Sequence, residues 1–309
     1  MGSTGSNPSN FTGRRQFLKS LLGVSGVVEA SRAEARAESQ PAGYFYWADL
    51  KAGQVGFPAG TSVEPGSAGS VLKLVSAAAM RDKNVFPANQ TFECTGTIAL
   101  NKKTYSCQVA HGRLTLTQAI AHSCNVFFAQ AAERVSAETV LDYARRFGLE
   151  APVAGYPSGP FPERASAEAQ SYVLGLCQDL RPQGLQILRM VALIATRGSV
   201  PYLHSAESPD PDGQPFRIEL SAATWSVLGQ GMHLACREGT ARDLDPSDRL
   251  RIAAKTGTAP YGKTFQSWVA GYFPYDAPRY AFCARALHGT SQEKAVPLAR
   301  KYLFSTEWP

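Results

Sequence analysis

Strand-like patterns stand near both ends of the chain, and helical patterns fill the region between them. Residues 43–58 place aromatic strand formers on both sides of a short turn, which is typical of a β-hairpin. Three further strand-like runs occupy residues 250–258, 265–273 and 279–287, and a helical run over about residues 291–303 follows them. The pattern therefore predicts that strands both open and close the folded chain.

The middle of the chain has apolar residues at helical spacing. The predicted helices cover residues 71–81, 115–134, 137–147, 183–197 and 221–235. Ser123 interrupts the second of these runs. Strands that are segregated from helices favour an α+β fold, in which the N- and C-terminal strands form one antiparallel sheet with a helical middle region.

The first 41 residues differ in composition from the rest and predict an export signal with a linker, followed by one domain over residues 42–309. Arg14 and Arg15 precede Phe17–Lys19 as in a twin-arginine signal, and the apolar run Leu21–Val28 and the small residues of Ala35–Ala37 follow. The run is too short for a membrane span, which needs about 20 apolar residues. We expect export in the folded state by the twin-arginine route, to the periplasm or the outer face of the inner membrane. The alternative is a flexible basic tail.

Composition and charge narrow the class of protein. The chain has 309 residues, of which 44% are hydrophobic, enough for one substantial core. Its net charge is +6, but residues 1–37 contribute half of that excess, and the remainder carries 26 basic against 23 acidic residues. So small an excess, without a basic stripe, argues against a nucleic-acid partner.

The cysteines and histidines show no metal-binding pattern. No Cys-x-x-Cys pair occurs, and the five histidines lack ligand spacing, so we expect no metal and no cofactor. In an exported protein Cys94 and Cys107 could form a disulfide, but two free thiols fit the sequence equally well. His122 adjoins Ser123, and we expect it to be structural. The six cysteines are Cys94, Cys107, Cys124, Cys177, Cys236 and Cys283.

The first motif with catalytic potential is Ser70-x-x-Lys73, placed where a Gly-rich loop meets the first predicted helix. At i+3 the Lys73 amine can reach Ser70 Oγ and act as its base, provided that the amine is neutral. Burial and a neighbouring cation, for which Lys255 is the candidate, would lower its pKa. A helix cap with a surface lysine is the ordinary alternative, and we assign it to the second copy, Ser291-x-x-Lys294.

The second motif is Ser123-Cys124-Asn125, between two helical runs. Such residues commonly cap helices. The functional interpretation makes Ser123 a proton relay between Lys73 and a leaving amine, and Asn125 a hydrogen-bonding partner for a substrate amide. We expect Cys124 to point into the core.

The third motif, Lys255-Thr256-Gly257-Thr258, ends a strand-like run. Gly257 would let a substrate backbone approach the strand, and the lysine and threonines would bind a carboxylate. The backbone N–H groups of Thr258 and Ser70 could form an oxyanion hole. We expect Ser70, Lys73, Ser123 and Lys255 to converge around one groove.

The three motifs occur in the order found in β-lactamases and penicillin-binding proteins. From about residue 43 to the C-terminus the chain resembles the transpeptidase domain of penicillin-binding proteins, closest to the class B type. The resemblance also rests on Ala48–Ala59, Glu64–Ser67, Cys94–Gly96, Cys107, His111–Gly112, Ala119–Ala129, Arg237–Ala241 and Ser267–Pro274.

This resemblance implies the β-lactamase/transpeptidase fold and a serine-type D,D-transpeptidase. The enzyme would act on D-Ala-D-Ala stems of peptidoglycan through an acyl-Ser70 intermediate and bind β-lactams. With water as acceptor it would be a D,D-carboxypeptidase, and the sequence does not decide between the two. The expected partners are peptidoglycan stem peptides, β-lactams and a separate glycosyltransferase or envelope protein. The alternatives are a serine β-lactamase and a non-catalytic β-lactam sensor or peptidoglycan-binding scaffold.

Some residues depart from the family pattern. Ser67 competes with Ser70 for the nucleophile position, but only Ser70 has a lysine at i+3. Ala254 stands where the family usually has glycine, and Gly175–Gln178 lacks the usual Gly-Gln-Gly run. The absence of a pedestal predicts a free-standing transpeptidase domain.

Overall fold

The structure is a computed structural model that describes residues 43–58, 64–87, 89–206 and 213–308. The predicted export signal and the domain boundary after residue 41 lie outside the described residues. No helix in the described part of the chain combines the length and the apolar character needed to span a membrane.

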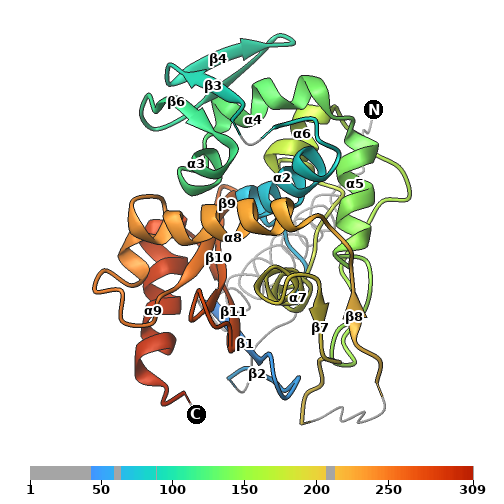
Figure 1. Ribbon diagram of the computed structural model, residues 1–309, viewed down its shortest axis with the longest axis vertical. Coiled ribbons are helices and arrows are strands. Elements are labelled where there is room, and N and C mark those ends of the chain that lie inside the picture. Colours follow the sequence, from blue (N-terminus) through green and yellow to red (C-terminus); the bar gives the residue numbers. More distant parts are fainter. Residues whose placement is uncertain (1–42, 59–63, 88, 207–212, 309) are drawn as a thin grey trace, which may run out of the picture. The chain divides into compact units, whose positions relative to one another are not determined.

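A five-stranded antiparallel sheet joins the two ends of the described chain, as the sequence predicted (Figure 1). Strand β1 pairs with β11 along its whole length, so that Tyr46 lies opposite Cys283. Strand β9, which carries the third motif, is an edge strand. The order is β2-β1-β11-β10-β9, with bounds β1 Gly43–Asp49, β2 Val55–Gly56, β9 Ala253–Tyr261, β10 Thr264–Phe273 and β11 Tyr280–Leu287.

Successive side chains along each strand point to opposite faces of the sheet, and both faces are buried. Tyr44, Tyr46 and Trp268 belong to the larger apolar core on the side of the helical region. Phe45 belongs to a second core with the C-terminal helix, where its ring stacks on Tyr302 with centroids 4.8 Å apart. Burial on both faces fixes the strand register, since a slip by one residue would exchange the two cores.

Apart from the short helices α6 and η3, which were not predicted, the helices follow the predicted runs closely. The second run is indeed broken at Ser123, which separates α3 from α4. The predicted first helix begins with a 3₁₀ turn, and the last with a π-helical turn. Their bounds are η1 Gly69–Leu72, α2 Lys73–Asp82, α3 Leu116–Ala121, α4 Asn125–Ala131, η2 Ala132–Arg134, α5 Ala137–Arg146, α6 Ala169–Leu174, α7 Gly184–Ala195, α8 Ala222–Arg237, η3 Arg242–Leu244, η4 Ser291–Ala295 and α9 Val296–Ser305.

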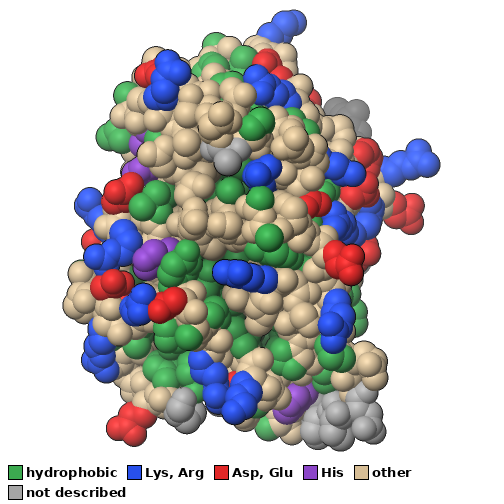
Figure 2. All heavy atoms as spheres, in the orientation of Figure 1, with side chains coloured by type: hydrophobic (Ala, Val, Ile, Leu, Met, Phe, Trp, Pro, Cys, Tyr) green, Lys and Arg blue, Asp and Glu red, His purple; other side chains and the backbone are tan. Residues whose placement is uncertain are grey.

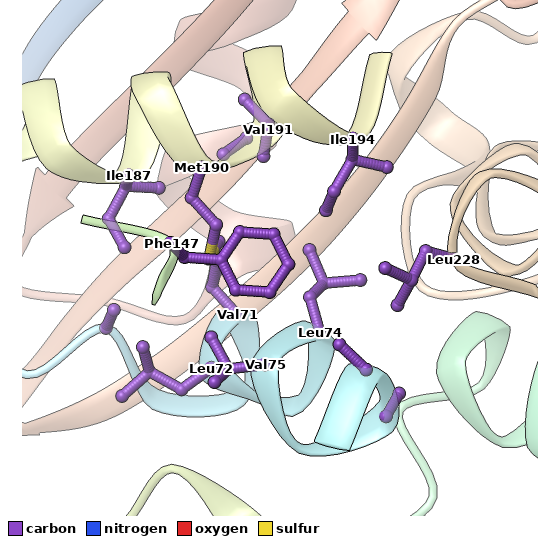
Figure 3. Packing of buried hydrophobic residues seen from close by; sticks show 14 of the residues in the cluster. Val71, Leu72, Leu74, Val75, Phe147, Ile187, Met190, Val191, Ile194 and Leu228 are labelled. Carbon is purple, nitrogen blue, oxygen red and sulfur yellow. The ribbon is translucent and has the colours of Figure 1, made fainter. Parts of the chain in front are cut away.

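Helix α7 is buried along all twelve of its residues. A helix that is buried on every side lies inside a core, and α7 packs between the sheet and α2. Figure 3 shows the Phe147 ring between Met190 of α7 and Leu74 of α2. This layer holds the N-terminal end of α2, and with it Lys73, in a fixed place behind the sheet edge.

Three short two-stranded ribbons were not predicted. Ribbons β3–β6 and β4–β5 lie beside α4, where they border the second motif (Figure 1). Strands of two to four residues give too little alternation to be recognised from sequence. Their bounds are β3 Thr91–Cys94, β4 Thr97–Leu100, β5 Lys103–Ser106, β6 Gly112–Thr115, β7 Ser199–Val200 and β8 Phe216–Arg217.

The surface carries charges of both signs. On the face in Figure 2, lysine and arginine side chains alternate with acidic ones and do not form a stripe. This distribution agrees with the small net charge of residues 38–309.

Candidate active site

Ser70 and Lys73 lie at the junction of η1 and α2. Ser70 is the second residue of the 3₁₀ turn and is partly exposed, whereas Lys73 is the first residue of α2 and is fully buried. Side chains at i and i+3 eclipse each other on a 3₁₀ helix. The two residues therefore lie on the same side of the chain, one above the other.

Glycines hold the η1 turn against β9. Gly69 has φ +54°, and a Cβ there would lie 2.4 Å from the carbonyl oxygen of Thr258. A Cβ at Gly257 would lie 2.3 Å from the carbonyl oxygen of Ala68. Glycine at position 257 thus lets the nucleophile turn pack against β9, and the approach of a substrate backbone at Gly257 stays a prediction. Gly175 closes the contact from α6, since its Cβ would lie 2.1 Å from the carbonyl oxygen of Gly69.

Ser123 occupies a constrained turn between α3 and α4. Its φ of +53° is in the left-handed region, which costs a non-glycine residue about 1–2 kcal/mol. Cys124 caps α4 and is fully buried, as predicted, and Asn125 is the first residue of that helix. The turn directs Ser123 and Asn125 toward the two lysines, and surrounding contacts must stabilise it.

The two lysines converge on the second motif. Lys73 Nζ donates hydrogen bonds to the carbonyl oxygen of Ser123 at 2.9 Å and to Asn125 Oδ1 at 2.5 Å. Lys255 Nζ donates to Ser123 Oγ at 2.8 Å and to the carbonyl oxygen of Thr256 at 2.8 Å. No hydrogen bond joins Ser70 Oγ to Lys73 Nζ, although both residues are among those the structure describes. The convergence is therefore built around Ser123, with Ser70 alongside.

Burial lowers the pKa of both lysines, because a charged amine loses solvation in the interior. The pKa of Lys73 falls to about 8. The pKa of Lys255 falls well below its usual value, and the nearby charge of Lys73 lowers it further. A neutral amine at position 73 is thus accessible near neutral pH, as the sequence analysis required.

A groove of about 690 Å³ opens over these residues. Both lysines are fully buried and lie beneath its lining. The groove exposes residues from all three motifs, namely Ser70, Ser123, Asn125, Thr256, Gly257 and Thr258.

Among the groove residues that were not selected from the sequence, Thr240 and Ser291 contact the third motif. Thr240 Oγ1 lies 2.6 Å from Thr256 Oγ1, and Ser291 donates its backbone N–H to Thr258 Oγ1 at 3.2 Å. Their signals were visible, because Thr240 belongs to the quoted Arg237–Ala241 segment and Ser291 begins the second Ser-x-x-Lys copy. Both residues orient the hydroxyl groups of the third motif.

Ser67 and Ser70, the two candidates for the nucleophile position, differ in their surroundings. Ser67 is buried, and its backbone carbonyl accepts a hydrogen bond from Trp268 Nε1 at 2.9 Å. Ser70 lines the groove, and Ser67 is not among its lining residues.

One departure from the family pattern is compensated locally. Ala254 pairs with Gly271 on β10, and a Cβ on Gly271 would lie 2.8 Å from the Ala254 Cβ. Gly271 leaves room for the methyl group of Ala254, which therefore fits without displacing the third motif.

Comparison with known proteins agrees with this geometry. Residues 51–303 match the penicillin binding protein transpeptidase domain. Peptidoglycan D,D-transpeptidase PbpA of Mycobacterium tuberculosis is 29% identical over 214 residues, which cover 60% of this chain and 43% of PbpA. Penicillin-binding protein PbpB of Mycolicibacterium smegmatis is 27% identical over 282 residues, which cover 79% of this chain and 43% of PbpB. The chain thus spans less than half the length of these relatives.

Solved structures share the fold. Pseudomonas aeruginosa PBP2 in complex with WCK 5153 has a TM-score of 0.73 at 20% identity, covering 88% of this chain and 72% of that one. A structure of a peptidoglycan synthase complex has a TM-score of 0.75 at 24% identity, and the match covers 85% of this chain and 55% of that chain. The predicted α+β β-lactamase/transpeptidase fold is confirmed, and the chain belongs to the penicillin-binding protein transpeptidase family.

Proposed function

We propose that this protein is a D,D-transpeptidase-type serine acyltransferase that acts on D-Ala-D-Ala peptidoglycan stems through an acyl-Ser70 intermediate and is acylated by β-lactams. The observation that carries the proposal is the arrangement around Ser123, which accepts hydrogen bonds from two buried lysines beside the partly exposed Ser70. A structural turn has no need of two buried amines, each of which costs solvation free energy.

In the first step neutral Lys73 takes the proton of Ser70 Oγ as the oxygen attacks the carbonyl carbon of the substrate. The amine first has to turn from its present acceptors toward Ser70. The negative charge that develops on the carbonyl oxygen would be held by the backbone N–H groups of Ser70 and Thr258, since β9 is an edge strand with backbone groups free to face the groove.

In the second step Ser123 gives its proton to the leaving amine. Lys255 Nζ donates to Ser123 Oγ, so one lone pair of the hydroxyl is occupied and its own hydrogen can point into the groove. In its protonated form Lys255 also favours departure of that proton, because its charge stabilises the alkoxide that remains. Lys73, held at the Ser123 carbonyl, is close enough to return a proton afterwards.

The substrate-binding roles follow from the remaining hydrogen-bonding capacity. Asn125 accepts from Lys73, and its Nδ2 donates to the carbonyl oxygen of Ser106 at 2.7 Å, which leaves one N–H for a substrate amide. Thr256 and Thr258 present hydroxyl groups to a carboxylate. Lys255 is fully buried, so in its protonated form it attracts that carboxylate through its charge without direct contact.

The rate of acylation should increase with pH. Only the neutral form of Lys73 can accept the Ser70 proton, and the neutral fraction grows as the pH rises through the pKa of about 8. We expect the rate with a chromogenic β-lactam to rise between about pH 6 and 9 in stopped-flow measurements, with circular dichroism showing an unchanged fold. A rate that is flat or falls over this interval would contradict the role of Lys73 as base.

The class of enzyme is tested with a chromogenic cephalosporin. We expect a burst of about one product per chain followed by very slow turnover, because the acyl-enzyme of a transpeptidase accumulates with a β-lactam. Absence of both burst and covalent adduct in folded protein would leave only the sensor or scaffold interpretation.

A serine β-lactamase is the second candidate, favoured by one observation. Glu238 lines the groove, and its Oε1 lies 3.8 Å from His122 Nε2, so a carboxylate is available near the acyl group. Its side chain is 56% exposed, however, which leaves it without a fixed position for activating water. Sustained turnover that is lost in Glu238→Gln would establish this alternative.

The setting of the reaction is also a proposal. One similar structure is titled as a complex between PBP2 and MreC from Helicobacter pylori, and another as a peptidoglycan synthase complex. We infer that this chain works with a separate glycosyltransferase or envelope partner, outside the cytoplasm. Cell fractionation of the Arg14→Lys, Arg15→Lys chain tests the twin-arginine route, and unchanged export would contradict it.

A further inference from the structure

Four potential metal ligands meet beside the second motif. They are Cys94 at the end of β3, Cys107 just after β5, His111 just before β6, and Cys124, the N-cap of α4. Their ligand atoms all lie within 4.8 Å of one another. The sequence analysis expected no metal, because these residues have no recognised spacing; the unpredicted ribbons bring them together.

The distances between the ligand atoms fit tetrahedral coordination of one metal ion. Cys94 Sγ lies 3.8 Å from Cys107 Sγ, Cys107 Sγ lies 3.7 Å from Cys124 Sγ, and His111 Nδ1 lies 3.4 Å from Cys94 Sγ. Bond lengths of about 2.3 Å to sulfur and about 2.0 Å to nitrogen in a tetrahedral zinc site place two sulfurs about 3.8 Å apart and sulfur and nitrogen about 3.5 Å apart.

The chemistry of the donors also suits a cation. Cys94 and Cys124 are buried, and the sulfurs of Cys94 and Cys124 lie 3.8 and 3.7 Å from Cys107 Sγ, so thiolates at these positions would repel one another. A bound dication removes that repulsion, and metal binding releases the protons.

We propose that Cys94, Cys107, His111 and Cys124 bind one zinc ion in a closed structural site. Three thiolates and one imidazole form a soft ligand set that suits zinc and disfavours magnesium or calcium. Because the protein supplies all four ligands, the ion has no open position for substrate or water, and its role is positional.

The zinc site would hold the second motif in its strained turn. Cys124 lies between Ser123 and Asn125, which contact Lys255 and Lys73. Ser106, the neighbour of Cys107, accepts a hydrogen bond from Asn125 Nδ2 at 2.7 Å. The His111 ring also stacks on His122, with centroids 5.3 Å apart. The ion would thus tie both ribbons to the residues that position the lysines.

A Cys94–Cys107 disulfide would use two of the same thiols. The sequence analysis did not decide between this disulfide and two free thiols. In the structure all six cysteines are free, and Cys107 Sγ lies as near to Cys124 as to Cys94. A disulfide brings two sulfurs to about 2.0 Å and uses only one pair. It would leave Cys124 and His111 without a shared function.

The test uses the full chain, prepared with zinc under reducing conditions and freed of unbound metal. We expect elemental analysis to find about one zinc per chain, and Co²⁺ replacement to give the visible absorption of tetrahedral thiolate-bound cobalt. Cys94→Ala should bind zinc at least about 100-fold more weakly and lose the cobalt spectrum. Cys283→Ala, which removes a buried thiol in β11, is the matched control and should keep both.

Zinc content is measured independently of acylation. The Ser70→Ala chain, which cannot be acylated at Ser70, should therefore still bind zinc. This variant separates the zinc proposal from the proposed function. Removing zinc from the wild-type chain should slow acylation about 10- to 100-fold, and zinc should restore it. If Cys94→Ala does not fold, His111→Gln carries the same expectation. A wild-type chain that retains no zinc, or contains the Cys94–Cys107 disulfide after this preparation, overturns the proposal.

Discussion

Replacement of Lys73 by methionine should slow acylation by a β-lactam by about 100- to 10,000-fold, the range expected when a general base is removed. Methionine fills a similar buried volume without an amine, so the helix should still form. The hydrogen bonds to Ser123 and Asn125 are lost together with the base. The measurement is the second-order rate of acylation, followed with a fluorescent penicillin.

Lys294→Met is the matched control for this prediction. Lys294 occupies the same place in the second Ser-x-x-Lys copy, but its side chain is exposed at η4. We expect its acylation rate to remain within about twofold of wild type, since surface changes of this kind have small effects. Equal rates for both variants would show that Lys73 is not the base.

Replacement of Gly69 by alanine should reduce acylation about 100-fold or more. The new Cβ would lie 2.4 Å from the Thr258 carbonyl oxygen, so η1 and Ser70 must move away from β9. A displacement of about 1 Å at a reacting group can cost 100-fold in rate. The variant should also be less stable, because φ +54° is unfavourable for alanine.

The Gly262→Ala variant is the control that separates the steric clash of a Cβ from the free-energy cost of placing alanine in a left-handed backbone conformation. Gly262 has φ +56°, nearly the same as Gly69, but no atom lies within 4 Å of the Cβ position. Both variants should lose about 1–2 kcal/mol of stability from the left-handed backbone, measured by denaturant unfolding. Only Gly69→Ala should lose acylation, and equal acylation by the two would contradict the packing described for η1.

The fold was predictable where patterns are long. The hairpin of residues 43–58, the three C-terminal strands and the main helices were found because each has enough residues to show its period. The sheet pairing followed from the segregation of strands and helices. The 3₁₀ turn at Ser70 was missed, since a turn of four residues and the start of an α-helix have the same sequence pattern.

The site was predictable only as a set of residues. Spacing placed Lys73 beside Ser70, but the hydrogen bonds of both lysines to Ser123 depend on the meeting of α2, the α3–α4 turn and β9. The packing of Gly257 against Ala68 was not predicted, because the two residues are far apart in sequence. The cysteine and histidine cluster was missed for the same reason, as short ribbons without periodicity assemble it.

The most direct test of the central claim is to locate the acyl group. The wild-type chain is incubated with penicillin, digested and analysed by peptide mass spectrometry, with Ser67→Ala and Ser70→Ala treated in parallel. The account predicts one penicilloyl group on Ser70, retained in Ser67→Ala and absent from Ser70→Ala. An adduct on Ser67 or on another residue, or none on folded protein, would contradict it.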